Sequence, residues 1–312
     1  MYKFLQLIRF PNLVMIALTQ FLMYWYWINP FDTCYMKFDM FIYVMLATVC
    51  IAAGGNIIND IFDVKTDRIN KPHKLFIDTF ISKNVAYLLY FLFTFMGIGL
   101  GSYTGFASDH GANLFIFIGI AVALFLYSYY FKGIPFVGNV MVSILVTTSI
   151  YILVLFYNGE RFCSENNMKL FMQISLPAID IFAIFAFLIN LMREMVKDIE
   201  DINGDYNANI KTLPIILGRN RVNKIIAVLA GITILFAMYC ISQVLKGKTI
   251  TTVYVLLTIL LPLLYFIIKI WQADTKQEYR MLSLLLKLIM LFGILSTLVF
   301  YYFEPVETFS YL

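Results

Sequence analysis

The sequence predicts an all-α integral membrane protein, a bundle of about nine transmembrane helices around a central cavity. Three observations support this fold class. Hydrophobic residues make up 61% of the 312 residues and charged residues only 13%, against roughly a quarter in an average soluble domain. The apolar residues gather in runs close to the roughly 20 residues that cross a bilayer as a helix. Basic residues are unequally divided between the connections. We therefore expect residues 1–312 to form a single membrane-embedded domain, with two charged cytoplasmic loops capping the cavity.

Each predicted helix corresponds to one apolar run, and aromatic residues gather at several run ends, where interfacial belts lie. Lys3 and Arg9 precede the first run, which is long enough to be a spanning helix and not a cleavable signal peptide. The second and sixth runs lead into long charged connections, whereas most other connections are short. In chain order the runs cover residues 12–29, 39–58, 84–104, 112–131, 136–157, 170–192, 223–243, 251–271 and 282–303.

The distribution of Lys and Arg predicts the orientation. With the N-terminus inside, the 60–83 loop, Lys132, the 193–224 loop and the 269–287 segment are cytoplasmic together with the N-terminal residues, in agreement with the positive-inside rule. This places eighteen of the 23 basic residues inside. The five outside are Lys37, Arg161, Lys169, Lys246 and Lys248.

The four cysteines have no CxxC spacing, and the two histidines lie far from them, which argues against a zinc or haem site. Cys34 and Cys163 fall in loops on the same predicted outer side. A bridge between them is compatible with this placement, but two free thiols are the favoured interpretation.

The first charged connection carries an acidic motif. Residues 56–72 read NIINDIFDVKTDRINKP, which contains the pattern DxxDxxxD. At 100° per residue, the carboxylates of Asp60, Asp63 and Asp67 fall within about 60° on a continuing helix. The same face is widened to about 100° by two amides, those of Asn56 and Asn59.

The second charged connection repeats the pattern. Residues 193–205 read REMVKDIEDINGD and are followed by KTLP at 211–214. The carboxylates of Asp198, Asp201 and Asp205 again share about 60° of a helix. The polar neighbours that widen this face are Asn190, Glu194 and Lys197.

The two motifs follow even-numbered helices, so both emerge on one side of the membrane. Two facing columns of carboxylates repel each other unless a cation lies between them. Oxygen ligands without His or Cys suit Mg²⁺, which usually takes one or two carboxylates, waters and substrate phosphates. In a soluble protein such a helix is usually a solvated face, but ionisable groups at a membrane usually mark a site. The predicted metal ligands are Asn59, Asp60, Asp63, Asp67, Asp198, Asp201 and Asp205.

Basic residues are spaced among these acids and are expected to cradle a diphosphate with the metal. They are Lys65, Arg68, Lys71, Lys74, Arg193, Lys197 and Lys211. The fourth connection contains Tyr127 and Lys132, which taken alone fit an aromatic belt with a snorkelling lysine.

These motifs resemble those of the UbiA-type superfamily of intramembrane prenyltransferases. The family's NDxxDxxxDxxNxP motif is matched at residues 59–72, and its DxxxD followed by K-T-L-P is matched at residues 201–214. The tyrosine–lysine element after the fourth helix resembles Tyr127 and Lys132. Where many members continue the first motif with R-P-L-P-S-G, this chain has Lys74 in place of the arginine. The helix count and motif placement agree as well, so the resemblance covers nearly the whole chain.

The resemblance implies Mg²⁺-dependent transfer of a polyprenyl group from an allylic prenyl diphosphate to a lipid-soluble acceptor. The implied catalytic residues are Asp63, Asp67, Asp201 and Asp205. Lys132 joins the residues that bind diphosphate, and Tyr127 and Asn56 orient the substrate. No nucleic acid and no obligatory protein partner is implied.

The acceptor has two interpretations within the superfamily. The run REMVKDIEDINGD-x5-KTLP is most similar to members that prenylate geranylgeranylglyceryl phosphate in ether-lipid synthesis, and it is also similar to quinone-pathway members with aromatic acceptors. A cation-coupled transporter is a remote alternative, because its acids would lie near the bilayer midplane and not at one interface. A CDP-alcohol phosphotransferase would require glycine and Ala-Arg elements that the acidic motifs do not contain.

Overall fold

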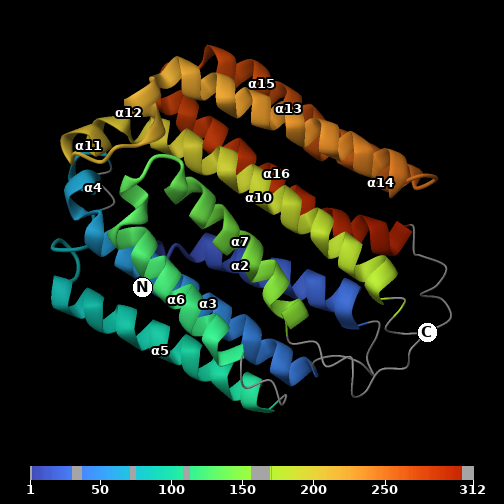
Figure 1. Ribbon diagram of the computed structural model, residues 1–312, viewed down its shortest axis with the longest axis horizontal. Coiled ribbons are helices and arrows are strands. Elements are labelled where there is room, and N and C mark those ends of the chain that lie inside the picture. Colours follow the sequence, from blue (N-terminus) through green and yellow to red (C-terminus); the bar gives the residue numbers. More distant parts are fainter. Residues whose placement is uncertain are drawn as a thin grey trace.

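The computed structural model describes residues 2–29, 37–70, 75–107, 113–155, 169 and 171–303, and within these ranges the chain is helical without a β-strand (Figure 1). The predicted all-α class is confirmed. Prolines lie in the first turn of α2 and α12, where the missing N–H removes no helical hydrogen bond. Prolines also lie at the start of α10 and α15, each of which directly follows a π-helical turn. In chain order the elements are α1 (Tyr2–Leu7), α2 (Phe10–Met23), η1 (Tyr24–Ile28), α3 (Phe38–Phe62), α4 (Val64–Asn70), α5 (Lys83–Ala107), α6 (Leu114–Tyr129), η5 (Phe131–Gly133), α7 (Val137–Leu155), η6 (Phe171–Ser175), α10 (Leu176–Glu200), α11 (Ile202–Asn207), α12 (Leu213–Leu217), α13 (Arg219–Gln243), α14 (Thr249–Val255), η7 (Leu256–Leu260), α15 (Leu261–Gln272) and α16 (Lys276–Phe303).

Seven helical segments in the described ranges are long and apolar enough to cross a membrane. They are Phe38–Phe62, Lys83–Ala107, Val137–Leu155, Phe171–Glu200, Arg219–Gln243, Thr249–Gln272 and Lys276–Phe303. The remaining two predicted spans correspond to shorter helices: α6 has 16 residues, and α2 has 14 residues and runs directly into the π-helical turn η1. The predicted count of nine therefore stays a prediction for these two segments.

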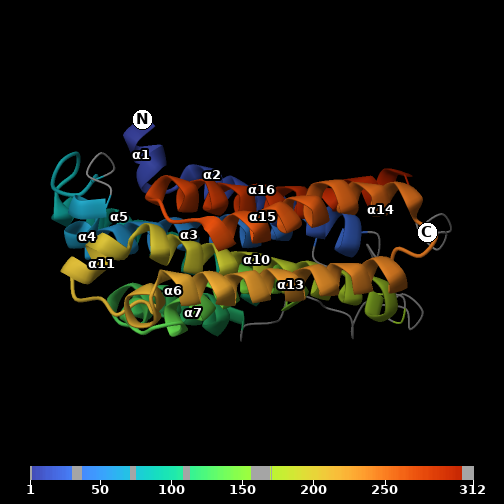
Figure 2. The ribbon, with the colours of Figure 1, turned by 90° about the horizontal axis from the view of Figure 1, so that it is seen from above.

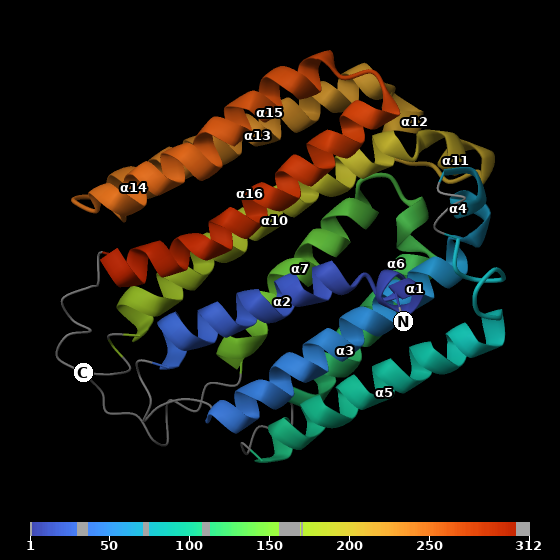
Figure 3. The same cartoon turned by 180° about the vertical axis from the view of Figure 1, so that it is seen from behind.

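The long helices run roughly parallel to one another and cross the view of Figure 1 obliquely. Viewed from above, α2 and α16 occupy one side and α6, α7 and α13 the other, with α3 and α10 between them (Figure 2). Seen from behind, α2 lies between α3 and α16 and contacts both (Figure 3). The short helices α4 and α11 contact each other at one end of the bundle. This end carries both acidic motifs.

The outer faces of the helices remain apolar. Leu88 and Phe95 of α5 and Leu235 of α13 are 67%, 66% and 68% exposed. A soluble monomer rarely exposes large contiguous apolar patches, whereas a bilayer needs such a surface. Inside the bundle, buried clusters hold the helices together. In one of them, the ring of Tyr24 stacks on that of Phe41 with centroids 4.2 Å apart.

Both motif helices end at the second acid of their motif. Asp63 caps α3 with φ −84° and ψ 0°, and Asp201 caps α10 with φ −98° and ψ 5°. A new short helix then starts in each case, at Val64 and at Ile202. The expectation of one continuing helix through each motif is therefore wrong. The break redirects the third acid of each motif together with α4 or α11.

Helices α3 and α5 pack closely at glycines, which gives a test of the fold. A Cβ at Gly97 would lie 2.6 Å from Ile51 Cγ1 and 2.9 Å from the Ala47 carbonyl oxygen. Because a backbone atom is among these contacts, Gly97→Ala forces the helices apart, and we expect a loss of about 1–3 kcal/mol of stability. Thermal unfolding of the detergent-purified protein measures this as a lower midpoint.

Gly99→Ala is the matched control, because it lies on the same helix and nothing is within 4 Å of its Cβ position. Alanine is the better helix former, so this variant should unfold at the wild-type midpoint or slightly above it. Equal midpoints for the two variants would contradict the close α3–α5 packing.

Candidate active site

A cavity of about 720 Å³ runs into the bundle from the end that carries the acidic motifs. All six carboxylates of the two DxxDxxxD patterns line it, although the patterns lie more than 130 residues apart in the sequence. Further in, the lining is largely apolar, with side chains such as Ile120, Leu124, Phe182, Ile189 and Met290. The cavity therefore joins a highly charged mouth to an apolar interior.

The first motif is paired with basic groups from distant segments. Asp60 Oδ1 accepts a hydrogen bond from Arg9 Nη2 at 2.9 Å. Asp63 Oδ2 forms an ion pair with Lys132 Nζ and also accepts a hydrogen bond from Asn59 Nδ2 at 2.7 Å. Burial alone would lower the pKa of the Lys132 ammonium, but the Asp63 carboxylate outweighs it and raises this pKa above its ordinary value. Lys132 therefore carries a positive charge in the site.

The second motif is supported within the bundle. Asn139 of α7 donates a hydrogen bond from Nδ2 to Asp198 Oδ2 at 2.8 Å. Glu194 Oε1 accepts hydrogen bonds from both Lys197 Nζ, at 2.5 Å, and Arg193 Nη1, at 3.3 Å. Two cations thus share one carboxylate on α10.

Asn70 joins the two motifs directly. Its Nδ2 donates to the Asp201 carbonyl at 2.7 Å, and its Oδ1 accepts from the Gly204 N–H at 2.9 Å. The close approach requires glycine at 204, because a Cβ there would lie 2.3 Å from Asn70 Nδ2. Lys276 of α16 donates to the Asn70 carbonyl at 2.7 Å. One buried amide therefore fixes α4 against α11.

The structure brings most of the predicted site residues together, but not all. Asn56, Asn59, Tyr127, Lys132, Arg193 and Lys197 line the cavity with the six carboxylates. Arg68 and Lys211 are exposed and do not line it, so the expected cradle does not include them in this arrangement. Lys71, Lys74, Cys34 and Cys163 lie outside the described residues. Asn56 donates its Nδ2 to the Ile8 carbonyl at 2.9 Å and so ties α3 to the start of the chain.

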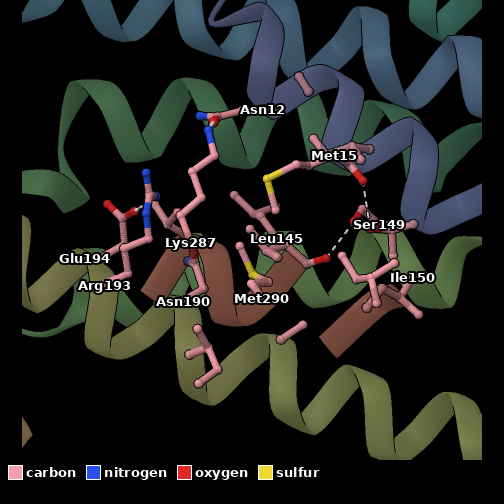
Figure 4. Close-up of a pocket in the computed structure, with 18 of the residues that line it drawn as sticks. Asn12, Met15, Leu145, Ser149, Ile150, Asn190, Arg193, Glu194, Lys287 and Met290 are labelled. Carbon is pink, nitrogen blue, oxygen red and sulfur yellow. Dashed lines mark hydrogen bonds and ion pairs between the residues drawn. The ribbon is translucent and has the colours of Figure 1, made fainter. Parts of the chain in front are cut away.

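Arg9, Asn12 and Lys287 line the cavity but were not predicted as site residues. Arg9 binds Asp60, and Lys287 Nζ donates to Asn12 Oδ1 at 2.6 Å (Figure 4). Asn139, which is not among the lining residues, was also not predicted and donates to Asp198. The sequence places Lys287 both in the predicted cytoplasmic segment 269–287 and in the apolar run 282–303. In the structure it lies within α16 and lines the cavity. Its isolated charge within an apolar run was the available signal.

The donor set can be compared with the needs of a metal ion. Among the described residues, no group of three or more His, Cys, Asp or Glu side chains is arranged to hold a metal by itself. The oxygen donors instead face one cavity from two sides. This suits Mg²⁺, which keeps several waters and takes substrate phosphate oxygens in addition to one or two carboxylates. The residues therefore fit a metal that arrives with a diphosphate.

The fold and the site together define a multi-pass membrane protein with an acidic, oxygen-rich mouth above an apolar cavity. Residues 13–302 match the model of the UbiA prenyltransferase family, so the chain belongs to that family. It is a membrane prenyltransferase that uses a prenyl diphosphate, and the transporter and phosphotransferase alternatives are set aside.

Particular relatives refine this assignment. The chain is 31% identical over 299 residues to digeranylgeranylglyceryl phosphate synthase of Saccharolobus solfataricus, covering 95% of each chain. Its fold is similar to that of a solved digeranylgeranylglyceryl phosphate synthase, with a TM-score of 0.64 and 23% identity over 96% of this chain and 97% of the other. A UbiA homologue from Archaeoglobus fulgidus bound to GPP and Mg²⁺ matches with a TM-score of 0.56 and 15% identity, over 95% and 99% of the two chains.

The Asn70 bridge gives a prediction for the site. Asn70→Ala removes the two hydrogen bonds that join α4 to α11. The Gly204 N–H and the Asp201 carbonyl keep their backbone hydrogen bond to each other, so the expected cost is that of the lost bonds, about 0.5–1.5 kcal/mol each. We expect a lower unfolding midpoint and reduced diphosphate release, because α11 carries Asp205 into the cavity mouth. Asn203→Ala is the control, since Asn203 is an exposed asparagine of α11, next to Gly204. Wild-type stability and turnover of Asn70→Ala would show that the bridge is dispensable.

Proposed function

We propose that the protein catalyses Mg²⁺-dependent transfer of a polyprenyl group from its diphosphate to geranylgeranylglyceryl phosphate or a similar lipid alcohol. The observation that carries the acceptor class is the 31% identity, over 95% of both chains, to a digeranylgeranylglyceryl phosphate synthase. The cavity supports the same reaction, because its charged mouth suits a diphosphate and its apolar interior suits a prenyl chain. An aromatic acceptor of quinone-pathway type is the alternative within the family.

The carboxylates at the mouth would hold the metal. We assign Asp63 and Asp67 from one side and Asp201 and Asp205 from the other, because all four line the cavity around the α4–α11 contact. Supporting ligands are Asn59 and Asp198, and Asp60 also remains a candidate, although Arg9 binds one of its oxygens. When bound there, Mg²⁺ supplies positive charge that stabilises the departing diphosphate.

Three basic side chains would complete the diphosphate site. Lys132, Arg193 and Lys197 all line the cavity, and each is already held by a carboxylate of the site. These pairs fix the positions of the cations before the substrate binds. Preorganised charges of this kind act on the transition state without a cost of reorganisation at the moment of reaction.

The apolar interior would control the fate of the prenyl group. The bond between the prenyl C1 and the diphosphate oxygen breaks, and its electron pair leaves with the diphosphate. The allylic cation that develops must be shielded from water, which the apolar lining provides. The acceptor hydroxyl oxygen then forms the new bond to C1, and its proton leaves with the diphosphate. Tyr127 and Asn56 both line the cavity, and we assign them to substrate orientation.

An acceptor assay tests the proposed function. Purified protein with Mg²⁺ and geranylgeranyl diphosphate should alkylate geranylgeranylglyceryl phosphate and release diphosphate. An aromatic quinone precursor should react at least about tenfold more slowly than geranylgeranylglyceryl phosphate. A loss of roughly 1.4 kcal/mol in binding, from its different shape and charge, is enough for a factor of ten. Product formation is followed by mass spectrometry. Transfer to the aromatic compound alone would contradict the acceptor assignment and favour the quinone-pathway alternative.

Exchange of single acids for amides tests the metal site. Asp63→Asn and Asp201→Asn keep the side-chain size but remove one negative charge each. We expect each change to reduce turnover on the order of 10²–10³-fold, as for loss of one electrostatic contact to a transition state. A higher Mg²⁺ concentration should also be needed for half-maximal diphosphate release, and excess chelator should abolish activity.

Asp78→Asn is the matched control for these two variants. Asp78 is exposed, lies outside the cavity and has a positive φ of 66°, a conformation that asparagine also tolerates. It should keep wild-type activity and Mg²⁺ dependence. Full activity of Asp63→Asn and Asp201→Asn, or equal loss in Asp78→Asn, would refute the assignment.

We also propose that the cavity mouth faces the cytoplasm and that the chain is one domain. The eighteen-to-five division of basic residues supports the orientation, and a family match spanning residues 13–302 supports the single domain. Both acidic motifs lie at the same end of the bundle, so one orientation places them together.

Reporter fusions measure the orientation. A reporter that is active only in the cytoplasm should be active after Lys71 or Arg219 and inactive after Lys246. The reverse pattern would place the site on the outer face.

A further inference from the structure

Lys287 is a positive charge that neither acidic motif binds. It lies eleven residues after the start of α16, about 16 Å along the helix axis, and it lines the cavity. Its side chain reaches across to Asn12 of α2, and this neutral amide is the partner the structure gives it (Figure 4). In the described part of the chain, no carboxylate forms an ion pair with Lys287. An ammonium held within a membrane helix in this way usually marks a functional site.

The charge around Lys287 is unbalanced. Arg193 and Lys197 share the single carboxylate of Glu194, and Lys287 has no ion-pair partner among the described residues. Arg193 lies near enough to Lys287 for the two cations to repel each other. The Arg193 Nε–H is also buried without a hydrogen-bond partner among the described residues. One bound anion would accept a hydrogen bond from the Arg193 Nε–H. It would also offset the repulsion between the charges of Arg193 and Lys287.

We infer that Lys287, Asn12 and Arg193 form a second anion subsite, which binds the phosphate group of the acceptor. This inference rests on the proposed function, in which the prenyl diphosphate binds at the acidic mouth. Arg193, which we also assign to the diphosphate site, would lie between the two anions. Arg193 places the subsite next to the mouth, because it lies on α10 between Asn190 and Asp198 and, like both of them, lines the cavity. An anion there would therefore lie beside the diphosphate site and not among its metal ligands.

The chemistry of a glyceryl phosphate fits this arrangement. Its free hydroxyl is on the carbon next to the one that carries the phosphate, so anchoring the phosphate brings the hydroxyl within a few bonds of the subsite. The phosphate at Lys287 thus places the attacking oxygen near the diphosphate-bound end of the donor. A neutral lipid alcohol would leave the charges of Lys287 and Arg193 uncompensated, and a site built for a polar group discriminates against a substrate that lacks it.

A purely structural role for Lys287 makes a different prediction. If its bond to Asn12 only ties α16 to α2, then any substitution that keeps or strengthens that tie should leave substrate binding unchanged. Asn12→Asp separates the two roles, because an aspartate keeps the side-chain size and the acceptor oxygen but neutralises Lys287. The structural role predicts a stable protein with normal kinetics, whereas the anion subsite predicts a stable protein that binds the phosphorylated acceptor poorly.

The experiment compares two acceptors with the full-length protein in detergent, geranylgeranylglyceryl phosphate and geranylgeranylglycerol, at saturating geranylgeranyl diphosphate and Mg²⁺. For Lys287→Met and Asn12→Asp, we expect the KM for the phosphorylated acceptor to rise about tenfold to a hundredfold, the range for loss of one hydrogen bond to a charged group. The KM for the prenyl diphosphate and the unfolding midpoint should not change. Lys287→Arg should restore most of the lost affinity.

Lys269→Met is the matched control, a lysine-to-methionine change on an exposed position of membrane helix α15 that does not line the cavity. It should behave as wild type with both acceptors. If Lys287→Met does not accumulate, Asn12→Asp and the wild-type preference between the two acceptors decide the question.

Two failures can be told apart. Wild-type protein that alkylates geranylgeranylglyceryl phosphate but does not prefer it over geranylgeranylglycerol, or variants with an unchanged acceptor KM, overturn the subsite and leave the proposed function intact. An equal rise in the KM for both donor and acceptor also overturns it, in favour of a structural tie. Wild-type protein that transfers the prenyl group but accepts no glyceryl phosphate overturns the proposed acceptor itself, and the subsite with it.

Discussion

The structure depends on holding six carboxylates together at one end of an apolar bundle. Like charges at this spacing repel each other, and a membrane offers little water to screen them. The molecule offsets part of the repulsion with basic groups from distant segments, since Arg9 binds Asp60 and Lys132 binds Asp63. Amides of Asn59 and Asn139 donate hydrogen bonds to two of the acids. In the proposed function, the remaining negative charge is what the metal that accompanies the diphosphate would neutralise.

The same constraint explains the layout of the helices. Each motif helix stops at its second acid, so the third acid is carried by a short separate helix that can turn toward the opposite motif. Asn70 then joins the two short helices by accepting from one backbone group and donating to another. The long helices supply the apolar cavity, and the short ones close its charged end. In the proposed function, the short helices would therefore bind the diphosphate, and the long helices would shield the allylic cation from water.

Much of this could be predicted from the sequence, because the determining signals are local. Apolar runs and their lengths predict the all-α membrane fold, and repeated acids at helical spacing predict that both motifs contribute to one site. Pairing across the bundle could not be predicted, because nothing in the residues around Arg9 specifies Asp60 as its partner. The cavity-facing position of Lys287 could not be predicted for a related reason: in an apolar run, a lysine that snorkels and a lysine that faces a cavity look alike. The exposure of Arg68 and Lys211 could not be predicted either. A rotation of 100° per residue holds only along a continuous helix, and each motif helix ends at its second acid.

The contact between Asn70 and Gly204 has a consequence for how the gene can vary. A residue inserted into a helix rotates everything after it by about 100° and moves it by about 1.5 Å. Between Asp63 and Asn70, or between Asp201 and Gly204, such a change would carry one side of the contact away from the other, since the amide tolerates no Cβ opposite it. Substitutions can accumulate along both segments, but their lengths are linked. An insertion or deletion in one short helix would then preserve the contact only if a compensating change arose in the other, so we expect the lengths of the two segments to change together or not at all.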